Sequence, residues 1–312
     1  MVSEVKNVEI VEIKSGSIPT VKITGIKNFD IEKIFDCGQC FRFDRVENSA
    51  HGVEFSGVAY GRFVSFAQDR DAVYIYGSTR EEFDSIWKRY LDIERDYDGV
   101  GEDILSHCDT EAMRSAIDYS RGIRILAQDP FECVISFIVS QNNNIPRIKK
   151  IIEALCLKCG TPIEISAEMR EHLSGKSSLC AFPDASALAA LGEDGLFELK
   201  TGFRAKYIYD AVTRCLDGRL NVDSIIAAND TESAISALCE VKGIGRKVAS
   251  CALLFGFCRY DAFPVDVWIK RVGDKYFGDE GKEISGERFG AYAGIAQQYL
   301  FYYERYRSLE GE

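Results

Sequence analysis

The stretch Leu238–Val267 reads LCEVKGIGRKVASCALLFGFCRYDAFPVDV, and it decides the fold of this chain. Two glycines, Gly243 and Gly245, form a turn that ends directly before a long apolar helical run. A glycine turn between two helices directs backbone N–H groups outward, where they can hold a phosphate. The pattern therefore predicts two helices joined by a glycine hairpin over residues 231–258.

Lys247 lies where this hairpin becomes a helix. The positive end of the helix dipole disfavours a charged ammonium there, so we expect the amine to lose its proton easily. A neutral lysine amine is a nucleophile, whereas the charged form is not. Lys247 is therefore the first candidate for a catalytic residue.

Asp266 follows Lys247 by nineteen residues. A helix from Lys247 would advance roughly 18 Å, and an extended return segment can cover about 23 Å, so the chain can bring the two residues together. Asp266 also precedes a helical run, which makes it a helix N-cap. A fixed carboxylate beside a neutral amine suits a reaction that builds positive charge on a sugar carbon.

The length of 312 residues allows two domains and a large buried core. No apolar run is long enough to span a membrane, and the first residues lack the pattern of a signal peptide. Eleven irregularly scattered cysteines favour reduced thiols inside a cell. We therefore expect no membrane partner, and a location that is cytoplasmic in a prokaryote or nuclear in a eukaryote.

Two cysteine pairs, Cys37/Cys40 and Cys156/Cys159, have metal-like spacing and could form a four-thiolate zinc site. The pairs are more than a hundred residues apart, and the second belongs to an apolar helical run, where cysteine behaves as a small hydrophobe. Coincidence is the favoured interpretation, so no zinc is expected. No cysteine follows Cys258, which argues against an iron–sulfur cluster.

The net charge of −11 argues against a generic nucleic-acid-binding protein. The charge is uneven, because residues 1–120 carry −9 and residues 121–312 carry only −2. Positive side chains of the second part occur in short clusters. An acidic body with a local basic groove is compatible with DNA binding, and a set of solvated helix faces is the simpler alternative.

Residues 8–78 are rich in Val, Ile, Phe and Tyr, and they predict antiparallel strands with a hairpin turn at residues 69–71. Helical patterning dominates from residue 79, apart from an acidic, glycine-containing stretch at residues 96–103. The predicted fold class is α+β. An antiparallel β-sheet domain with flanking helices would occupy residues 1–115, and an all-helical domain residues 116–312.

Four further segments agree with one family in their order along the chain. With the hairpin, Lys247 and Asp266, they resemble the eukaryotic-type 8-oxoguanine DNA glycosylases of the helix-hairpin-helix glycosylase superfamily. The resemblance implies an N-terminal domain similar to half of a TATA-binding protein, and it covers nearly the whole chain. The segments are Gly38–Arg42 (GQCFR), Ser136–Ile145 (SFIVSQNNNI), Gly202–Ala205 (GFRA) and Gly294–Phe301 (GIAQQYLF).

This resemblance implies a base-excision repair enzyme, acting as a monomer, that removes 8-oxoguanine opposite cytosine from double-stranded DNA. In the family the lysine amine attacks the sugar C1′ and displaces the damaged base, which assigns Lys247 as the nucleophile. Asp266 would stabilise the oxocarbenium-like charge and orient the amine. The resulting imine acidifies the C2′ proton, so a lyase step would nick the strand by β-elimination.

The target base must be flipped out of the duplex before attack. By resemblance, Phe203 is the apolar wedge on the opposite strand, and Asn142 occupies the space that the lesion vacates. Arg147 and Arg204 would donate hydrogen bonds to the orphaned cytosine, which the fixed fork of an arginine suits. A core phenylalanine and a helix-ending asparagine are the simpler alternatives.

Lesion recognition depends on one hydrogen, because 8-oxoguanine carries N–H at N7 where guanine has a lone pair. The resemblance assigns the carbonyl that accepts this proton to Gly38, whose missing side chain allows close approach. Gln297 would bind the Watson–Crick edge, Phe301 would stack on the base, and Cys251 would cover its other face. Each of these three could alone be an ordinary core residue.

The hairpin backbone would hold a DNA phosphate and, as in related hairpins, could hold Na+ or K+. No other cofactor is expected. The groups concerned are the N–H groups of Gly243, Gly245 and Val248 for the phosphate, and the carbonyls of Cys239, Val241 and Ile244 for the cation.

Three positions depart from the family pattern and suggest a divergent branch: Trp268, Lys242 and Ser250. Two alternatives stay open. One is a related glycosylase for an oxidised pyrimidine or an adenine mismatch, against which the absent cysteine cluster and the GQCFR segment count. The other is a non-catalytic DNA-binding module, for which Asp266 would be unnecessary.

Overall fold

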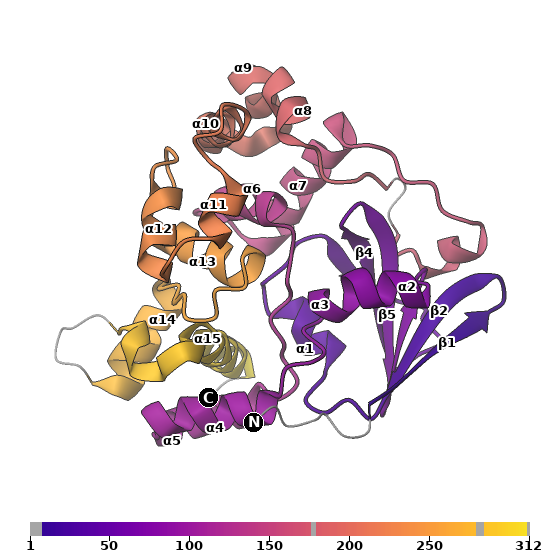
Figure 1. Cartoon of the computed structure of the whole chain (residues 1–312), viewed down its shortest axis with the longest axis horizontal. Helices are drawn as coiled ribbons and strands as arrows, with labels where there is room; N and C mark the ends of the chain where they lie inside the picture. Colours follow the sequence, from indigo (N-terminus) through magenta and orange to yellow (C-terminus); the bar gives the residue numbers. More distant parts are fainter. Residues whose placement is uncertain (1–7, 176–178, 279–283, 311–312) are drawn as a thin grey trace.

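The computed structural model of the chain describes residues 8–175, 179–278 and 284–310. An antiparallel sheet and a larger helical part lie side by side (Figure 1). The predicted α+β class is confirmed. Within the described ranges, no helix has the length and apolar character needed to cross a membrane.

Six strands form one antiparallel sheet in the order β1-β2-β6-β5-β4-β3. The predicted hairpin turn is present between β5 and β6, where Arg70 takes a φ of 42°. The partial alternation of the sequence reflects a sheet that is covered on both faces over most of its width. The strands are β1 (Glu9–Ser15), β2 (Ile18–Thr24), β3 (Phe43–Arg45), β4 (Val53–Ala59), β5 (Arg62–Asp69) and β6 (Ala72–Tyr76).

An aromatic cluster fills the first face of the sheet. The rings of Phe35 and Phe43 lie 4.6 Å apart, and the ring of Phe66 lies 5.7 Å from Trp87 in an edge-to-face arrangement. Phe35 comes from α1 and Trp87 from the helical stretch at residues 80–90, so these two elements cover this face (Figure 1). Such pairs add about 0.5–1.5 kcal/mol each beyond their buried area.

Two helices were not expected from the sequence. α1 (Ile31–Asp36) interrupts the predicted strand region, because Asp30 caps it and its short apolar face packs on the sheet. α4 (Tyr97–His107) occupies the acidic, glycine-containing stretch, with Asp96 as its N-cap. Gly101 lowers helix propensity there, and a Cβ at this position would make only an ordinary contact of 3.6 Å with Ile117 Cγ2 of the next helix.

The helical part surrounds α13, whose residues from Val248 to Gly256 are all buried. α6 and α12 pack against it, and α15 closes the assembly (Figure 1). Short π-helical or 3₁₀ segments lie at residues 83–87, 168–172, 197–201, 202–204, 273–277 and 286–292. The remaining helices are α2 (Arg80–Glu82), α3 (Lys88–Tyr90), α5 (Glu111–Tyr119), α6 (Pro130–Ser140), α7 (Ile145–Cys159), α8 (Ala185–Ala190), α9 (Gly192–Leu196), α10 (Ala205–Leu216), α11 (Val222–Ile226), α12 (Thr231–Cys239), α13 (Arg246–Gly256), α14 (Val267–Val272) and α15 (Ala293–Glu310).

The two hydrophobic cores divide the chain earlier than the predicted boundary at residues 115/116. Apart from Leu126, the sheet core ends at Ile93, whereas the helical core takes in Cys37 and Phe41 and then residues from Tyr97 onward. α5 packs on α15, where the Tyr119 and Tyr302 rings lie 5.8 Å apart. α4 and α5 therefore belong by packing to the helical part. The limits of independently folding domains stay a prediction.

The chain also crosses back from the helical part to the sheet after α7. Met169 packs on the second face of the sheet beside Phe63 and Tyr76. His172 and the buried carboxylate of Glu54 lie 2.6 Å apart. This return segment covers apolar sheet surface that would otherwise face water (Figure 1).

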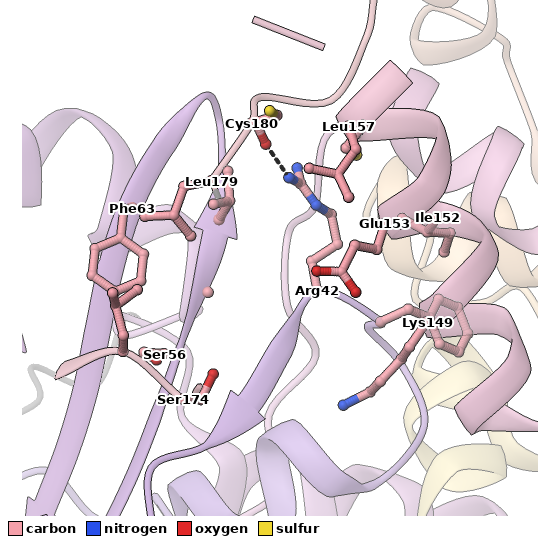
Figure 2. A pocket seen from close by; sticks show the side chains of 15 residues that line it. Arg42, Ser56, Phe63, Lys149, Ile152, Glu153, Leu157, Ser174, Leu179 and Cys180 are labelled. Atoms are coloured by element: carbon pink, nitrogen blue, oxygen red, sulfur yellow. Dashed lines mark hydrogen bonds between the residues drawn. The ribbon is translucent and has the colours of Figure 1, made fainter. Parts of the chain in front are cut away.

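A buried ion pair joins the two parts at the GQCFR segment. Arg42 Nη1 lies 3.4 Å from Glu132 Oε2 of α6, and the two side chains are only 10 % and 15 % exposed. Arg42 also donates a 2.5 Å hydrogen bond to the carbonyl of Cys180 (Figure 2). The adjoining cavity, between β4, β5 and α7, has a volume of about 30 Å³, which suits one water molecule rather than a base. Burial raises the pKa of Glu132 to about 7, although Arg42 opposes this effect.

Replacing Arg42 by methionine should lower the free energy of unfolding by about 3 kcal/mol at pH 8, because Glu132 would become a buried charge without its partner. Glu132 is neutral below its pKa of about 7, so the loss should shrink when the pH falls to 6. Urea unfolding at both pH values measures the effect. The double variant Arg42→Met/Glu132→Gln should recover most of the loss, and equal losses at both pH values would contradict the assignment.

Candidate active site

The glycine hairpin between α12 and α13 has the geometry of a phosphate-binding turn. Gly243 has a φ of 81°, and a Cβ placed on it would lie 2.4 Å from the ring of Tyr207, so only glycine fits there. Gly245 is the N-cap of α13 and offers no side-chain cap. The N–H groups of the first helical turn, Val248 included, therefore lack an intrahelical partner and can bind an anion.

Lys247 lies in this first turn and is partly buried. Its Nζ is 6.0 Å from the ring centre of Phe137, and it interacts with Cys251, which lies one turn further along α13. Cys251 is 5 % exposed, and burial raises the pKa of its thiol. The predicted nucleophile and one predicted pocket residue are therefore in contact.

The expectation of an easily deprotonated Lys247 is wrong for the free protein. Interaction with Cys251, and then the negative charge of Asp266, hold the pKa of Lys247 above its ordinary value, and together they outweigh burial, which acts in the opposite direction. The sequence placed both groups near Lys247, but the prediction for its pKa considered only the helix dipole. The amine of the resting protein is therefore charged at neutral pH.

Asp266 has the capping role that its sequence position predicted. Its Oδ1 accepts hydrogen bonds of 2.9 Å from the N–H groups of Trp268 and Ile269, which caps α14. Its charge also acts on both Lys247 and Cys251. No ion pair within 4.0 Å joins Asp266 to Lys247 in the described part of the chain, so the carboxylate acts on the amine through its field.

Gly38 and Phe301 meet although 263 residues separate them. A Cβ placed on Gly38 would lie 3.9 Å from Phe301 Cε1, 3.8 Å from Ile145 Cδ1 and 3.6 Å from Arg305 Nη1. Gly38 has a φ of 82°, a conformation that disfavours side chains. A flat base that stacks on Phe301 would thus present its edge to the Gly38 backbone.

Buried amides on both sides hold the Gly38 turn. Gln39 donates to the carbonyls of Ile34 and Arg124 at 2.9 and 2.8 Å and is completely buried. Gln298 of α15 donates to the carbonyl of Cys37 at 2.9 Å. Within the described residues, no hydrogen bond is made to the Gly38 carbonyl itself. The turn is therefore fixed while its central acceptor stays available.

Gln297 lies on α15 one turn before Phe301, so both side chains share one helix face. It is 5 % exposed, and its amide makes no hydrogen bond within the ranges that the structure describes. Gln297 is not among the side chains with a fully buried unpaired polar atom, so its amide reaches solvent and is available to a ligand. Gly294 brings this helix close to α13, since a Cβ there would lie 2.6 Å from Leu254 Cδ1.

A cleft of about 690 Å³ opens at the N-terminal end of α13. Lys247, Arg246 and Ser250 line one side of it, and residues of the 261–265 and 284–290 segments line the other. The lining does not include Gly38, Gln297 or Phe301. Lys247, the predicted nucleophile, is accessible from this cleft, and the predicted base-binding residues lie outside it.

The residues predicted to enter the duplex are exposed, with one exception. Asn142 takes a φ of 46° in the turn between α6 and α7, and the Phe203 side chain is 48 % exposed. Arg147 is also exposed and makes neither an ion pair nor a hydrogen bond through its side chain in the described ranges. Arg204 differs from the expectation, because it is buried and bound to backbone carbonyls.

Sequence reasoning missed two site residues. Arg305 reaches Gly38 from the turn of α15 after Phe301, and its guanidinium lies 5.7 Å from the Phe301 ring. Ile145 closes the same space from the start of α7. The sequence offered only a weak signal for Arg305: it lies four residues after Phe301, which places both side chains on one face of the helix. At Trp268, which departs from the family pattern, Arg271 stacks on the indole at 4.9 Å.

Comparison with known proteins agrees with this geometry. Residues 22–134 match the family described as 8-oxoguanine DNA glycosylase, N-terminal domain, and residues 135–288 match the HhH-GPD superfamily base excision DNA repair proteins. A probable N-glycosylase/DNA lyase of Methanothermobacter thermautotrophicus is 31 % identical over 72 % of this chain and 75 % of its own length. An N-glycosylase/DNA lyase of Arabidopsis thaliana is 30 % identical over 58 % of this chain and 52 % of its own.

A solved structure is similar over nearly the whole chain. The 8-oxoguanine glycosylase/lyase of Clostridium acetobutylicum, in complex with double-stranded DNA containing cytosine opposite 8-oxoguanine, superposes with a TM-score of 0.85. The two sequences are 36 % identical, and the match covers 96 % of this chain and 98 % of that one. The chain therefore belongs to the 8-oxoguanine DNA glycosylases of the HhH-GPD superfamily of base excision DNA repair proteins.

Proposed function

We propose that this protein excises 8-oxoguanine opposite cytosine from double-stranded DNA and then cleaves the strand as a lyase. The observation that carries the proposal is the arrangement at the start of α13. There, Lys247 contacts Cys251 within the field of Asp266, beside N–H groups that no side chain caps. The membership of the chain in a glycosylase family and its likeness to a glycosylase/lyase support the same activity.

Lys247 would attack C1′ of the flipped nucleotide. The Nζ–C1′ bond forms while the C1′–N9 bond breaks, and the base leaves with the bonding electrons. Asp266, held in place by α14, stabilises the positive charge that develops on the sugar. Opening of the sugar gives an imine. Loss of the C2′ proton then expels the 3′ phosphate and nicks the strand.

The charged resting state of Lys247 makes proton loss part of the reaction. Only the neutral amine can attack, so its population limits the rate below the pKa of Lys247. Cys251 and Asp266 hold that pKa up in the free protein. A base that enters between Cys251 and Phe301 would separate the amine from the thiol and lower the pKa.

Recognition of the lesion would use the Gly38 turn. Its carbonyl accepts a hydrogen bond from the N7–H of 8-oxoguanine and repels the N7 lone pair of guanine. The unpaired Gln297 amide binds the Watson–Crick edge, and Phe301 stacks on the base. Arg305, next to Gly38, faces the same edge of the base.

DNA contacts outside the pocket would come from three exposed turns. The N–H groups of Gly243, Gly245 and Val248 bind a phosphate, Asn142 fills the vacated space, and Phe203 is the wedge. Arg147 donates to the orphaned cytosine. A Na+ or K+ ion at the carbonyls of Cys239, Val241 and Ile244 would add positive charge beside the phosphate. No group of three or more His, Cys, Asp or Glu suited to a metal occurs in the described ranges.

Borohydride trapping of a covalent adduct on 8-oxoguanine DNA tests the nucleophile. Lys247→Gln should abolish the adduct and slow base excision at least about a thousandfold, because no other amine occupies its place. Asp266→Asn should slow excision about a hundredfold. Lys242→Gln, in the same hairpin, should still give the adduct. An undiminished adduct with Lys247→Gln would reject the assignment.

The pH profile of kcat/KM tests the electrostatics of the site. Excision should accelerate as the pH rises towards the raised pKa of Lys247, since the neutral amine becomes more abundant. Cys251→Ala removes the largest cause of the raised Lys247 pKa, whereas burial, which lowers that pKa, remains. The ascending limb of the pH–rate profile should therefore move to lower pH. Single-turnover rates between pH 6 and 10 measure the limb, and an unmoved limb would show that Cys251 does not act on Lys247.

Arg147→Gln tests recognition of the opposite base. The variant should lose about tenfold in its preference for cytosine over adenine opposite the lesion, because a fork of donors is removed. Competing duplexes that differ only in this base give the ratio directly. Lys150→Gln, on the following turn of α7, serves as the control. Unchanged preference in Arg147→Gln would contradict the proposed contact.

A further inference from the structure

The Arg204 side chain connects two turns that lie about sixty residues apart in the sequence. Nε donates to the Gln141 carbonyl at 2.9 Å, and Nη2 donates to the carbonyls of Gln141 and Asn142, the latter at 3.0 Å. Nη1 donates to the Thr201 carbonyl at 3.2 Å. The residue is only 2 % exposed. The Arg204 guanidinium thus binds both the turn that follows α6 and the segment that leads into α10.

This burial has a cost that the carbonyls must offset. A guanidinium removed from water needs its N–H donors satisfied. No carboxylate pairs with Arg204 within the described residues, and the nearest charge that acts on it, that of Arg147, is repulsive. The three carbonyls therefore hold the cation, and the cation in return holds the two turns together.

Both turns carry side chains proposed to enter the duplex. Asn142 takes its left-handed conformation directly after Gln141, at the point where Arg204 binds. Phe203 precedes Arg204, and its exposed ring lies 4.4 Å from the guanidinium carbon. Lys200 and Gly202 both have positive φ, so the backbone before Phe203 also depends on outside support.

We propose that Arg204 is a positioning residue that locks the Asn142 turn and the Phe203 turn into one rigid wedge. The inference rests on the proposed function, because a wedge needs a duplex to open. A prealigned pair of side chains avoids the entropy cost of ordering each turn during base flipping. The resemblance to the family instead implies that Arg204 contacts the orphaned cytosine. That role would require the N–H donors of Arg204 to be free.

The two roles differ in their dependence on the opposite base. A duplex with a tetrahydrofuran residue opposite 8-oxoguanine contains no base for a direct contact. Arg204→Lys keeps the charge but cannot reach three carbonyls, so it should slow single-turnover excision about tenfold to a hundredfold opposite both cytosine and tetrahydrofuran. Arg147→Gln should show its penalty opposite cytosine only. A penalty for Arg204→Lys that disappears opposite tetrahydrofuran would overturn the proposal.

Hydrogen–deuterium exchange in the DNA-free protein gives a readout independent of activity. Arg204→Lys should accelerate exchange in residues 141–144 as well as in residues 200–204, while the melting temperature stays close to that of the wild type. Lys206→Gln, two residues further on, should leave residues 141–144 unchanged. Acceleration confined to residues 200–204 would also overturn the proposal. Absence of excision by the wild-type protein would reject the proposed function, and the exchange result would still decide the role of Arg204.

Discussion

Burial of α13 is the constraint on which the rest of the structure depends. Every residue from Val248 to Gly256 is buried, and the close approach of α6 leaves no room for a side chain at Gly256, where a Cβ would lie 2.7 Å from Cys133 Cβ. Only the N-terminal end of this helix reaches solvent. Lys247 therefore projects from the end of a helix that cannot shift, and the glycine hairpin before it is held in the same way.

Buried polar side chains fix the irregular backbone around this helix. Gln298 binds the Cys37 carbonyl just before Gly38, the Gln39 side chain ties the turn to the carbonyls of Ile34 and Arg124, and Arg204 binds the carbonyls of the Asn142 turn. In each case a side-chain donor supplies a hydrogen bond that a helix or sheet would otherwise supply. Recognition by backbone groups requires such support, because a turn without it would sample many conformations.

The electrostatics of the free protein favour the charged form of the Lys247 amine, whereas the proposed reaction requires the neutral form. The protein is acidic as a whole, and Cys251 and Asp266 favour the charged form of the Lys247 amine. Under the proposed mechanism, a base that displaces the thiol would shift this balance towards the neutral amine that the attack requires.

Local patterns in the sequence determined the strands of the sheet, most helix positions, the glycine hairpin and the capping role of Asp266. Each depends on residues within a few positions of one another, so propensity and periodicity suffice. α1 and α4 escaped prediction because packing outweighs their weak local signals. Only the tertiary structure decided the raised pKa of Lys247, the burial of Arg204 and the meeting of Gly38 with Arg305. These properties depend on the distances between side chains and on their desolvation in the folded chain, which propensity and periodicity do not give.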